Sequence, residues 1–193
     1  MNYFDVETQQ IKIESDLLYD YEIILDIGGG GEGVISKAFP KRTVIAIDNQ
    51  MTELMEANST AIKIEMDATD MKFAADNFKY ATAFFSFMYM SAAKRKAAIQ
   101  EIHRVLQKNG QLVIWDSVID YQANDSKYDA IIINLKITLL NNVKISTGYG
   151  VPYTADYALS KRNLVDDAEK IGFEILENRN IENTLFFLRL KKQ

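Results

Sequence analysis

Five glycines within six positions, Gly28–Gly31 and Gly33, are the feature that most constrains how this chain folds. They follow a short apolar run, Ile23–Ile27, of the kind that forms a parallel strand buried on two faces. We expect a helix over 33–39, because Pro40 ends the stretch that follows. Glycines in such a turn let the backbone approach a ligand without Cβ interference, although a tight turn without a ligand is the simpler alternative.

Apolar runs and amphipathic stretches go on alternating after this turn. The pattern predicts strands at 43–48, 61–66, 80–85 and 111–115, and helices at 50–58 and 92–106. Such alternation implies a parallel sheet with right-handed crossovers and helices on both faces. Ligands of these sheets bind at the carboxyl ends of the strands, where the glycine turn also lies.

The last third of the chain departs from the plain repeat. Apolar residues alternate on either side of Asn141-Asn142, which predicts a β-hairpin. A helix over 158–171 follows, and strands at 173–176 and 184–190 are expected to pair antiparallel because their link is short. We therefore expect a doubly wound, Rossmann-like three-layer α/β sandwich. Its sheet is mostly parallel and seven-stranded, with an antiparallel C-terminal strand and the inserted hairpin.

Composition excludes several classes of protein. The chain has no cysteine, so disulfides, zinc-thiolate sites and cysteine nucleophiles are ruled out. A net charge of −5 argues against broad nucleic-acid binding. Asp116, Asp120 and Asp125 have no accompanying histidine, so no metal site is expected. Neither a signal peptide nor an apolar stretch of about 18 residues is present, and we expect a cytoplasmic protein that does not enter membranes.

Two carboxylates indicate that the glycine turn belongs to a ligand-binding site. Asp48 closes the second strand 20 residues after Gly28, where a carboxylate can accept hydrogen bonds from both hydroxyls of a ribose. Asp67 follows the third strand, again at its carboxyl end. Because parallel strands end at one edge of their sheet, these side chains should lie near the turn.

With these residues, the chain resembles the class I S-adenosylmethionine (SAM)-dependent methyltransferases. Asp26–Gly33 is similar to their first motif, and Arg104–Gly110 to the helix-to-strand link that many members share before the fifth strand. The resemblance covers about 22–118 and resumes over 158–190. It implies SAM as the cofactor and S-adenosylhomocysteine (SAH) as the product.

The resemblance also implies roles for individual residues. Asp48 would bind the adenosine ribose, Asp67 the adenine amino group, and Asp26 the ammonium of the methionine part. The implied cofactor-binding set is Asp26, Gly28, Gly29, Gly30, Asp48, Asn49, Met66, Asp67, Ala68, Phe85 and Ser86. We expect a single domain made of an N-terminal extension (1–21), this cofactor-binding core (22–118), an inserted hairpin or cap (119–157), and a last helix with its strand pair (158–193).

The chain departs from the family pattern at two places. Glu32 stands where the family has its third glycine, with Gly33 one position later. After the fourth strand, Phe85–Tyr89 lacks the Asn/Asp-Pro-Pro-Tyr signature of enzymes that methylate amide or base amino groups. That class of acceptor is therefore disfavoured.

Two other functions remain open on the sequence. The glycine fingerprint of NAD(P)-binding oxidoreductases is also satisfied, by Gly28, Gly30 and Gly33. Three features argue against this class of enzyme: Asp26, Asp67 and the lack of a second domain. The fold could also bind SAM without turnover, as a sensor or a partner subunit. Methyl transfer needs chiefly correct positioning, and a general base only if the acceptor must lose a proton, so no catalytic residue can be named.

The acceptor is expected to be a small molecule that the sequence does not identify. Candidates for contact with it are Phe87, Tyr89, Tyr149 and Tyr153. Because only about 21 residues precede the first strand, residues 119–157 should supply most of the cover over the acceptor. The alternatives are that the hairpin, 129–147, forms a homodimer contact or merely extends a sheet edge.

Overall fold

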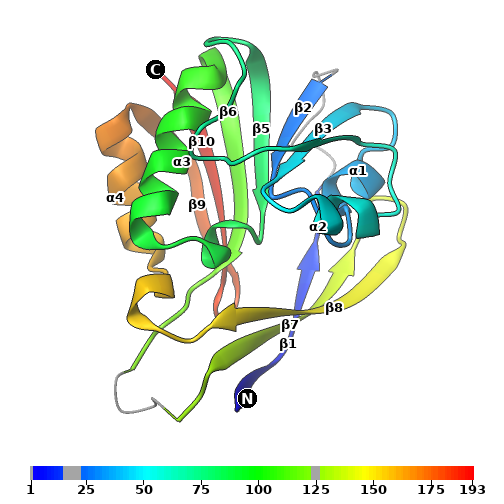
Figure 1. The fold of residues 1–193 in the computed structure, drawn as a ribbon, viewed down its shortest axis with the longest axis vertical. Coiled ribbons are helices and arrows are strands. Elements are labelled where there is room, and N and C mark those ends of the chain that lie inside the picture. Colours follow the sequence, from blue (N-terminus) through cyan, green and yellow to red (C-terminus); the bar gives the residue numbers. More distant parts are fainter. Residues whose placement is uncertain (1, 15–22, 123–126) are drawn as a thin grey trace.

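A seven-stranded sheet forms the body of the protein (Figure 1). The computed structural model describes residues 2–14, 23–122 and 127–193. The strand order is β4-β3-β2-β5-β6-β10-β9, and β10 runs antiparallel to both of its neighbours while the other pairs are parallel. This is the mostly parallel α/β sheet that the sequence predicts. The strands are β2 (Ile23–Ile27), β3 (Thr43–Asp48), β4 (Ile62–Glu65), β5 (Phe78–Phe84), β6 (Leu106–Ser117), β9 (Phe173–Glu182) and β10 (Leu185–Lys192).

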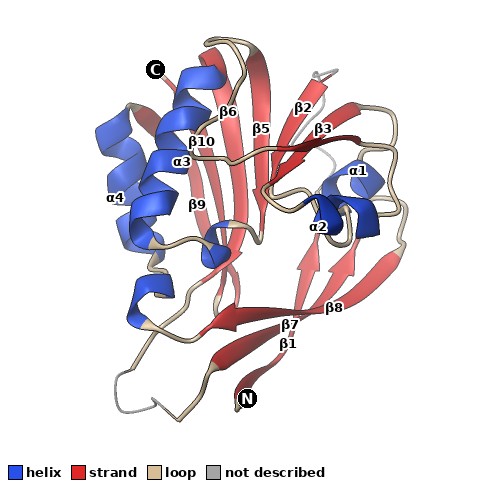
Figure 2. Ribbon diagram, in the orientation of Figure 1, coloured by secondary structure: helices blue, strands red, loops and turns tan. Residues whose placement is uncertain are grey.

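The helices divide between the two halves of this sheet (Figure 2). The described helices are α1 (Val34–Ala38), α2 (Met51–Glu56), α3 (Ala92–Val105) and α4 (Lys161–Ile171), with 3-10 turns η2 (Phe87–Tyr89) and η4 (Ala155–Tyr157). The long helices α3 and α4 lie together over β6 and β9, whereas the short α1 and α2 lie beside β3 and β4. Ser91 caps the start of α3, and the helix buries Ala98, Ile99 and Ile102 completely.

The strand order reverses between β2 and β5, and this reversal determines where a ligand can bind. From β2 the chain passes outward to β3 and β4, then returns to β5 on the other side of β2 and continues to β6. The loops that follow β2 and β5 therefore lead away from each other and leave an opening at the carboxyl ends of these strands. The glycine turn follows β2 at this opening.

A second, three-stranded sheet lies below the carboxyl ends of the large sheet in Figure 1. It consists of β1 (Tyr3–Lys12), β7 (Ala130–Thr138) and β8 (Lys144–Pro152), in the order β1-β7-β8. The antiparallel pair β7–β8 confirms the predicted hairpin, and its turn contains Asn142 with a left-handed φ of 61°.

Strand β1, which pairs parallel to β7, was not predicted from the sequence. From the sequence, only an N-terminal extension over 1–21 is expected, without a strand. Polar residues fill most of this segment, and Gln9 is fully buried where an alternating strand would carry an apolar side chain. The Gln9 amide donates to the hydroxyl of Thr184 at 2.8 Å and accepts from its backbone N–H at 3.0 Å, which satisfies a buried group that a sequence pattern cannot recognise as buried.

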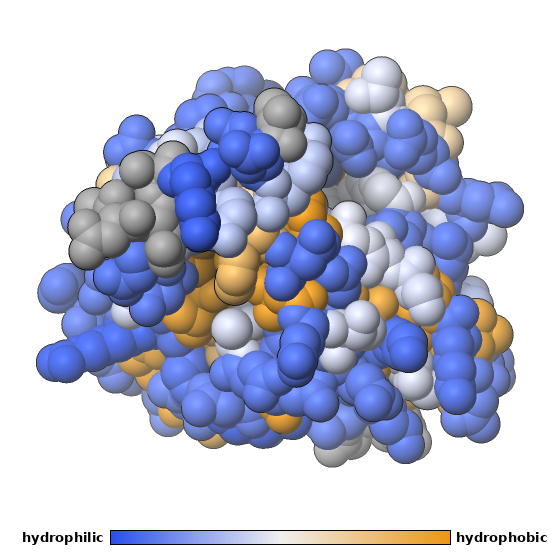
Figure 3. Space-filling view, turned by 90° about the horizontal axis from the view of Figure 1, so that it is seen from below, coloured by the Kyte–Doolittle hydropathy of each residue, from blue (hydrophilic) through white to orange (hydrophobic). Residues whose placement is uncertain are grey.

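Polar residues cover most of the face seen from below, with apolar residues showing in its middle (Figure 3). The small sheet contributes to this side of the molecule. Among the helices of the described ranges, none has the length and apolar character needed to cross a bilayer.

Candidate functional site

A cavity of about 580 Å³ lies at the carboxyl ends of β2, β3, β4 and β5. Its size is typical of pockets that hold a small molecule. All eleven residues of the expected cofactor set line it, as do Tyr89 and Tyr149. The structure thus brings together residues that lie far apart in the chain, from Asp26 to Tyr149.

The glycine turn forms one wall of the cavity and is packed too closely for side chains. The backbone N–H groups of Gly28 and Gly29 both donate to the carbonyl of Ile47, at 2.8 and 3.0 Å. A Cβ on Gly29 would lie 2.7 Å from the Cβ of Ala46, and one on Gly30 would lie 2.6 Å from the Cβ of Glu53. Gly28 also has a φ of 68°, which disfavours other residues. The turn is therefore a backbone surface that a ligand can approach closely.

Asp26 stands at the end of β2, beneath this turn, and is only 3% exposed. Its carboxyl group accepts a hydrogen bond of 2.7 Å from the hydroxyl of Thr82 on the neighbouring strand β5. Burial raises the pKa of Asp26 to about 7, and the nearby charge of Asp48 also acts in this direction. A cationic group in the cavity would stabilise the ionised form of this carboxyl.

Asp48 and Asp67 end or follow the next two strands and differ in their surroundings. Asp48 is half-buried at the end of β3 and accepts a hydrogen bond of 3.0 Å from the backbone N–H of Gln50. Burial raises the pKa of Asp48. Asp67 is exposed, and its carboxylate accepts from both the N–H and the hydroxyl of Thr69 at 2.8 Å, which lowers its pKa.

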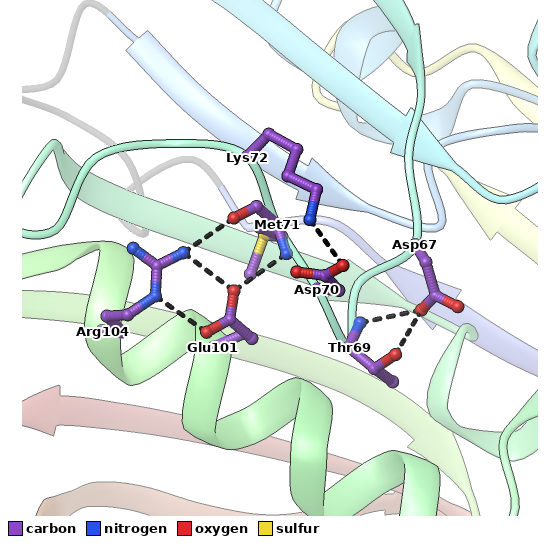
Figure 4. Close-up of polar contacts among 7 residues, drawn as sticks. All are labelled: Asp67, Thr69, Asp70, Met71, Lys72, Glu101 and Arg104. Carbon is purple, nitrogen blue, oxygen red and sulfur yellow. Dashed lines mark hydrogen bonds and ion pairs between the residues drawn. The ribbon is translucent and has the colours of Figure 1, made fainter.

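Helix α3 holds the segment that follows Asp67 in place (Figure 4). Glu101 accepts a hydrogen bond of 2.8 Å from the backbone N–H of Met71, while Arg104 donates to the carbonyls of Met71 and Phe73. The two side chains also form an ion pair of 2.7 Å. This contact explains why the segment 67–73, which lacks regular structure, keeps a defined position beside the cavity.

Glu32, the departure from the family pattern, connects the glycine turn to the small sheet. Its carboxylate accepts hydrogen bonds from the hydroxyl of Tyr149, at 2.8 Å, and from the hydroxyl of Thr147. Both donors lie on β8, and the ring of Tyr149 also contacts the ring of Phe85 at 5.5 Å between centroids. In the sequence, Glu32 stood out only because it occupies the position of the family's third glycine. Nothing in the sequence indicated that Thr147 and Tyr149 would donate to it.

Phe85 and Ser86 follow β5 on the opposite side of the glycine turn. Phe85 has a φ of 52°, a conformation that is strained for a residue other than glycine. Ser86 is 6% exposed, lines the cavity, and its hydroxyl has no hydrogen-bond partner among the described residues. This buried hydroxyl is therefore available to a ligand or a water molecule in the cavity.

Asp116, at the end of β6, is a positioning residue that the sequence did not reveal. This fully buried carboxyl accepts from the backbone N–H groups of Phe87, at 3.0 Å, and Met88, at 3.3 Å. It thereby holds the η2 turn that carries Tyr89. Burial raises the pKa of Asp116 to about 7. Its only sequence signal is its place at a strand end, which does not distinguish a positioning role from a solvated carboxylate.

Two of the expected acceptor contacts do not reach the cavity. Phe87 is completely buried, because η2 turns its side chain into the core and leaves Tyr89 43% exposed. Tyr153 is 8% exposed, and its hydroxyl donates to the carbonyl of Asp120 at 3.0 Å. His103 packs edge-on against Phe173 at 5.1 Å and does not line the cavity.

The residues present fit SAM on three structural grounds. The glycine turn is a cradle that a Cβ would fill, the Ser86 hydroxyl has no partner within the described residues, and two carboxylates follow successive strands. Residues 25–114 match the family model described as "Methyltransferase domain". No curated protein matches the chain in sequence.

Solved structures share this fold at low sequence identity. The PH0226 protein from Pyrococcus horikoshii has a TM-score of 0.67 at 14% identity, covering 92% of this chain and 84% of its own. A SAM-dependent methyltransferase from Methanosarcina mazei has a TM-score of 0.64 at 16% identity, covering 91% and 94%. The [4+2]-cyclase SpnF has a TM-score of 0.63 at 15% identity, covering 89% and 75%.

Residues 25–114 are thus similar to a methyltransferase domain, and the chain shares its fold with solved structures that are named as SAM-dependent methyltransferases. The family match indicates methyl transfer and does not identify the acceptor.

Proposed function

We propose that this protein transfers a methyl group from SAM to a small molecule held in the same cavity. The observation that carries the proposal is the glycine turn, with Asp48 and Asp67 at successive strand ends, opening into a cavity that extends to Tyr89 and Tyr149. The cavity measures about 580 Å³ and is lined on the β8 side by Tyr149, Gly150 and Pro152, where we place the acceptor.

Within this proposal the cofactor-binding residues have distinct tasks. Asp48 binds the ribose hydroxyls, Asp67 the adenine amino group, and Asp26 the ammonium group. Gly28 and Gly30 allow the methionine part to lie against the backbone. The Ser86 hydroxyl, which has no hydrogen-bond partner among the described residues, forms a hydrogen bond with the bound ligand.

The protein's contribution to the reaction is mainly positional. Bound SAM supplies an activated methyl group on a sulfonium. The η2 turn, held by Asp116, and strand β8, held by Glu32, orient Tyr89 and Tyr149 around the acceptor. Holding two reactants in a reactive geometry can account for much of the rate enhancement. We further propose that 119–157 acts as a cap on the cofactor-binding core, 22–118, in a single domain, and that β1 supports this cap from the far side of β7.

A second candidate function is SAM binding without methyl transfer. Its motivation is that the fold also occurs in SpnF, which is named as a [4+2]-cyclase, and a fold does not decide the chemistry that a site performs.

Calorimetric titration of the purified protein with SAH, with NADH as a control ligand, tests the cofactor. Micromolar binding of SAH alone is the expected result, and binding of NADH alone would overturn the proposal. Formation of SAH with any member of a broad acceptor panel then supports methyl transfer. Tight SAH binding with no turnover across the panel would favour the second candidate.

A further inference from the structure

Three tyrosines form the part of the cavity that no cofactor role accounts for. Tyr89 comes from η2, Tyr149 from β8 and Tyr157 from η4, and all three line the cavity. We call these residues the tyrosine wall. Phe85, which also lines the cavity, contacts the ring of Tyr149. A wall of aromatic rings favours a flat ligand, because stacked rings bury a large apolar area.

The charges along the cavity are strongly unequal. Of the described residues that line it, Lys94 is the only lysine or arginine, whereas five are carboxylates. These carboxylates are Asp26, Glu32, Asp48, Glu53 and Asp67. An anionic ligand would therefore be repelled from most of the lining, while a cation would be attracted.

The single positive charge among these lining residues, Lys94, stands in the first turn of α3, five positions after Tyr89. Lys94 helps to lower the pKa of Asp67, which places its charge near that carboxylate. Near the wall, burial raises the pKa of Tyr89, and the negative charges of Asp116, Glu32 and Glu53 raise it further. Burial and the charge of Glu32 raise the pKa of Tyr149 in the same way. Arg95 donates to the carbonyls of Met90 and Ala158, each next to a wall tyrosine, but it does not line the cavity. The lining itself thus combines aromatic rings with the carboxylates of Glu32 and Glu53, a combination that binds organic cations.

Neither a histidine nor a cysteine stands at the wall to serve as a base. The chain contains no cysteine, and its only histidine packs against Phe173 outside the cavity. An acceptor atom that already carries a free lone pair needs no base, since no proton has to leave it.

We propose that the tyrosine wall and Glu32 select a flat nitrogen heterocycle that is uncharged or cationic, and that they reject anionic acceptors. The selection of such a ring as methyl acceptor rests on the function proposed above. Only the uncharged ring reacts: the lone pair of its nitrogen forms the new N–C bond while the electron pair of the C–S bond stays on sulfur, and a cationic ring, such as the methylated product, binds without reacting at that nitrogen. The positive charge moves from sulfur to the ring nitrogen, beside the wall that stabilises it, and no proton is released.

Binding of three matched probes tests the selection without requiring turnover. N-methylquinolinium, quinoline and quinoline-6-carboxylate share one ring system and differ in charge. We expect calorimetry to give an affinity for the quinolinium about tenfold higher than for the carboxylate, with quinoline between them. Each probe is titrated with and without SAH, so that the charge preference is measured even if SAH fails to bind. Failure of SAH alone would contradict the proposed function and leave the wall's selectivity standing.

Two charge-removing variants test the residues responsible. Glu32→Gln keeps an amide oxygen for its partners on β8 but loses the charge. It should reduce the ratio of quinolinium affinity to carboxylate affinity several-fold. Glu56→Gln removes an exposed carboxylate on α2 that does not line the cavity, and it should leave the preference unchanged. Tyr89→Leu should weaken quinolinium binding more than carboxylate binding. Equal or tighter binding of the carboxylate, no binding of any probe, or equal effects of Glu32→Gln and Glu56→Gln would overturn the inference.

Discussion

The hydroxyl of Tyr149 donates a hydrogen bond of 2.8 Å to the carboxylate of Glu32, which lies 117 positions earlier in the chain. This contact joins the glycine turn to strand β8, and both line the cavity. A substitution at either residue should therefore alter the structure of both the glycine turn and strand β8.

Replacing Glu32 by Ala should loosen strand β8. The variant loses the hydrogen bonds from Thr147 and Tyr149, each worth roughly 1 kcal/mol at a partly exposed site. Amide hydrogen exchange over 144–152 should accelerate by about tenfold, because local opening becomes easier. Glu32→Gln, which retains an acceptor oxygen, should exchange nearly as slowly as the unmodified protein. Unchanged exchange in the alanine variant would show that the contact does not hold the strand.

Asp48→Ala should weaken SAH binding. Loss of one or two charge-assisted hydrogen bonds to the ribose costs roughly 1.5 to 3 kcal/mol each, or at least about tenfold in affinity. Calorimetric titration measures the change. Glu65→Gln is the matched control, since Glu65 pairs with Asp48 in the β3–β4 ladder but is exposed and does not line the cavity. If the alanine variant and the control bind SAH with equal affinity, Asp48 does not bind the ribose.

Gly30→Ala should destabilise the protein and weaken SAH binding together. Its Cβ would lie 2.6 Å from the Cβ of Glu53 and 3.0 Å from its carbonyl carbon, so α2 must move. We expect a loss of about 1 to 3 kcal/mol in the free energy of unfolding, measured with urea. At Gly31 no atom lies within 4 Å of the position that a Cβ would take, and φ is 58°, which asparagine tolerates. Gly31→Asn should thus cost under about 1 kcal/mol, and a similar loss in both variants would contradict this account.

Stability should depend on pH through Asp26. The pKa of this carboxyl rises from 3.8 to about 7 on folding, mainly through burial. Between these values the folded protein keeps a proton that the unfolded chain has released, so this contribution to stability is present at low pH and is lost as pH rises to about 7.

Asp26→Asn should remove this loss, because the amide stays neutral and its oxygen can still accept from Thr82. The free energy of unfolding of the variant, minus that of the unmodified protein, should increase from pH 4 to pH 7 by about 1.4 kcal/mol for each pH unit between the two pKa values. Asp116, whose pKa is also raised, is present in both proteins and cancels in the difference. A difference that does not change with pH would show that Asp26 is not held protonated.

The sequence predicted the large sheet well because its strands carry local signals. Apolar runs such as Ile23–Ile27 are long enough to be recognised, and the parallel arrangement brings their carboxyl ends to one edge. For this reason the sequence alone predicts Asp48 and Asp67 beside the glycine turn, and both line the cavity. The hairpin around Asn142 was equally local, since alternation and a turn residue define it.

The remaining features depend on partners far away in the chain. Strand β1 has a weak pattern and forms only because β7, about 127 positions later, offers an unpaired edge. Asp116 was visible as a carboxylate at a strand end, but its role follows from the N–H groups of η2 that it meets in the fold. Phe87 and Tyr89 are close in sequence and similar in character, yet the geometry of a 3-10 turn buries one and exposes the other.

By itself, the sequence determined the αβ repeat, the glycine turn and the carboxylates at the strand ends, because periodicity and backbone sterics act over a few residues. Only the tertiary structure decided that the N-terminal segment joins the hairpin, that Glu32 holds β8, and which aromatic residues face the cavity. These outcomes depend on which distant groups can satisfy one another's hydrogen bonds once the core is packed, and no local pattern in the chain encodes that choice.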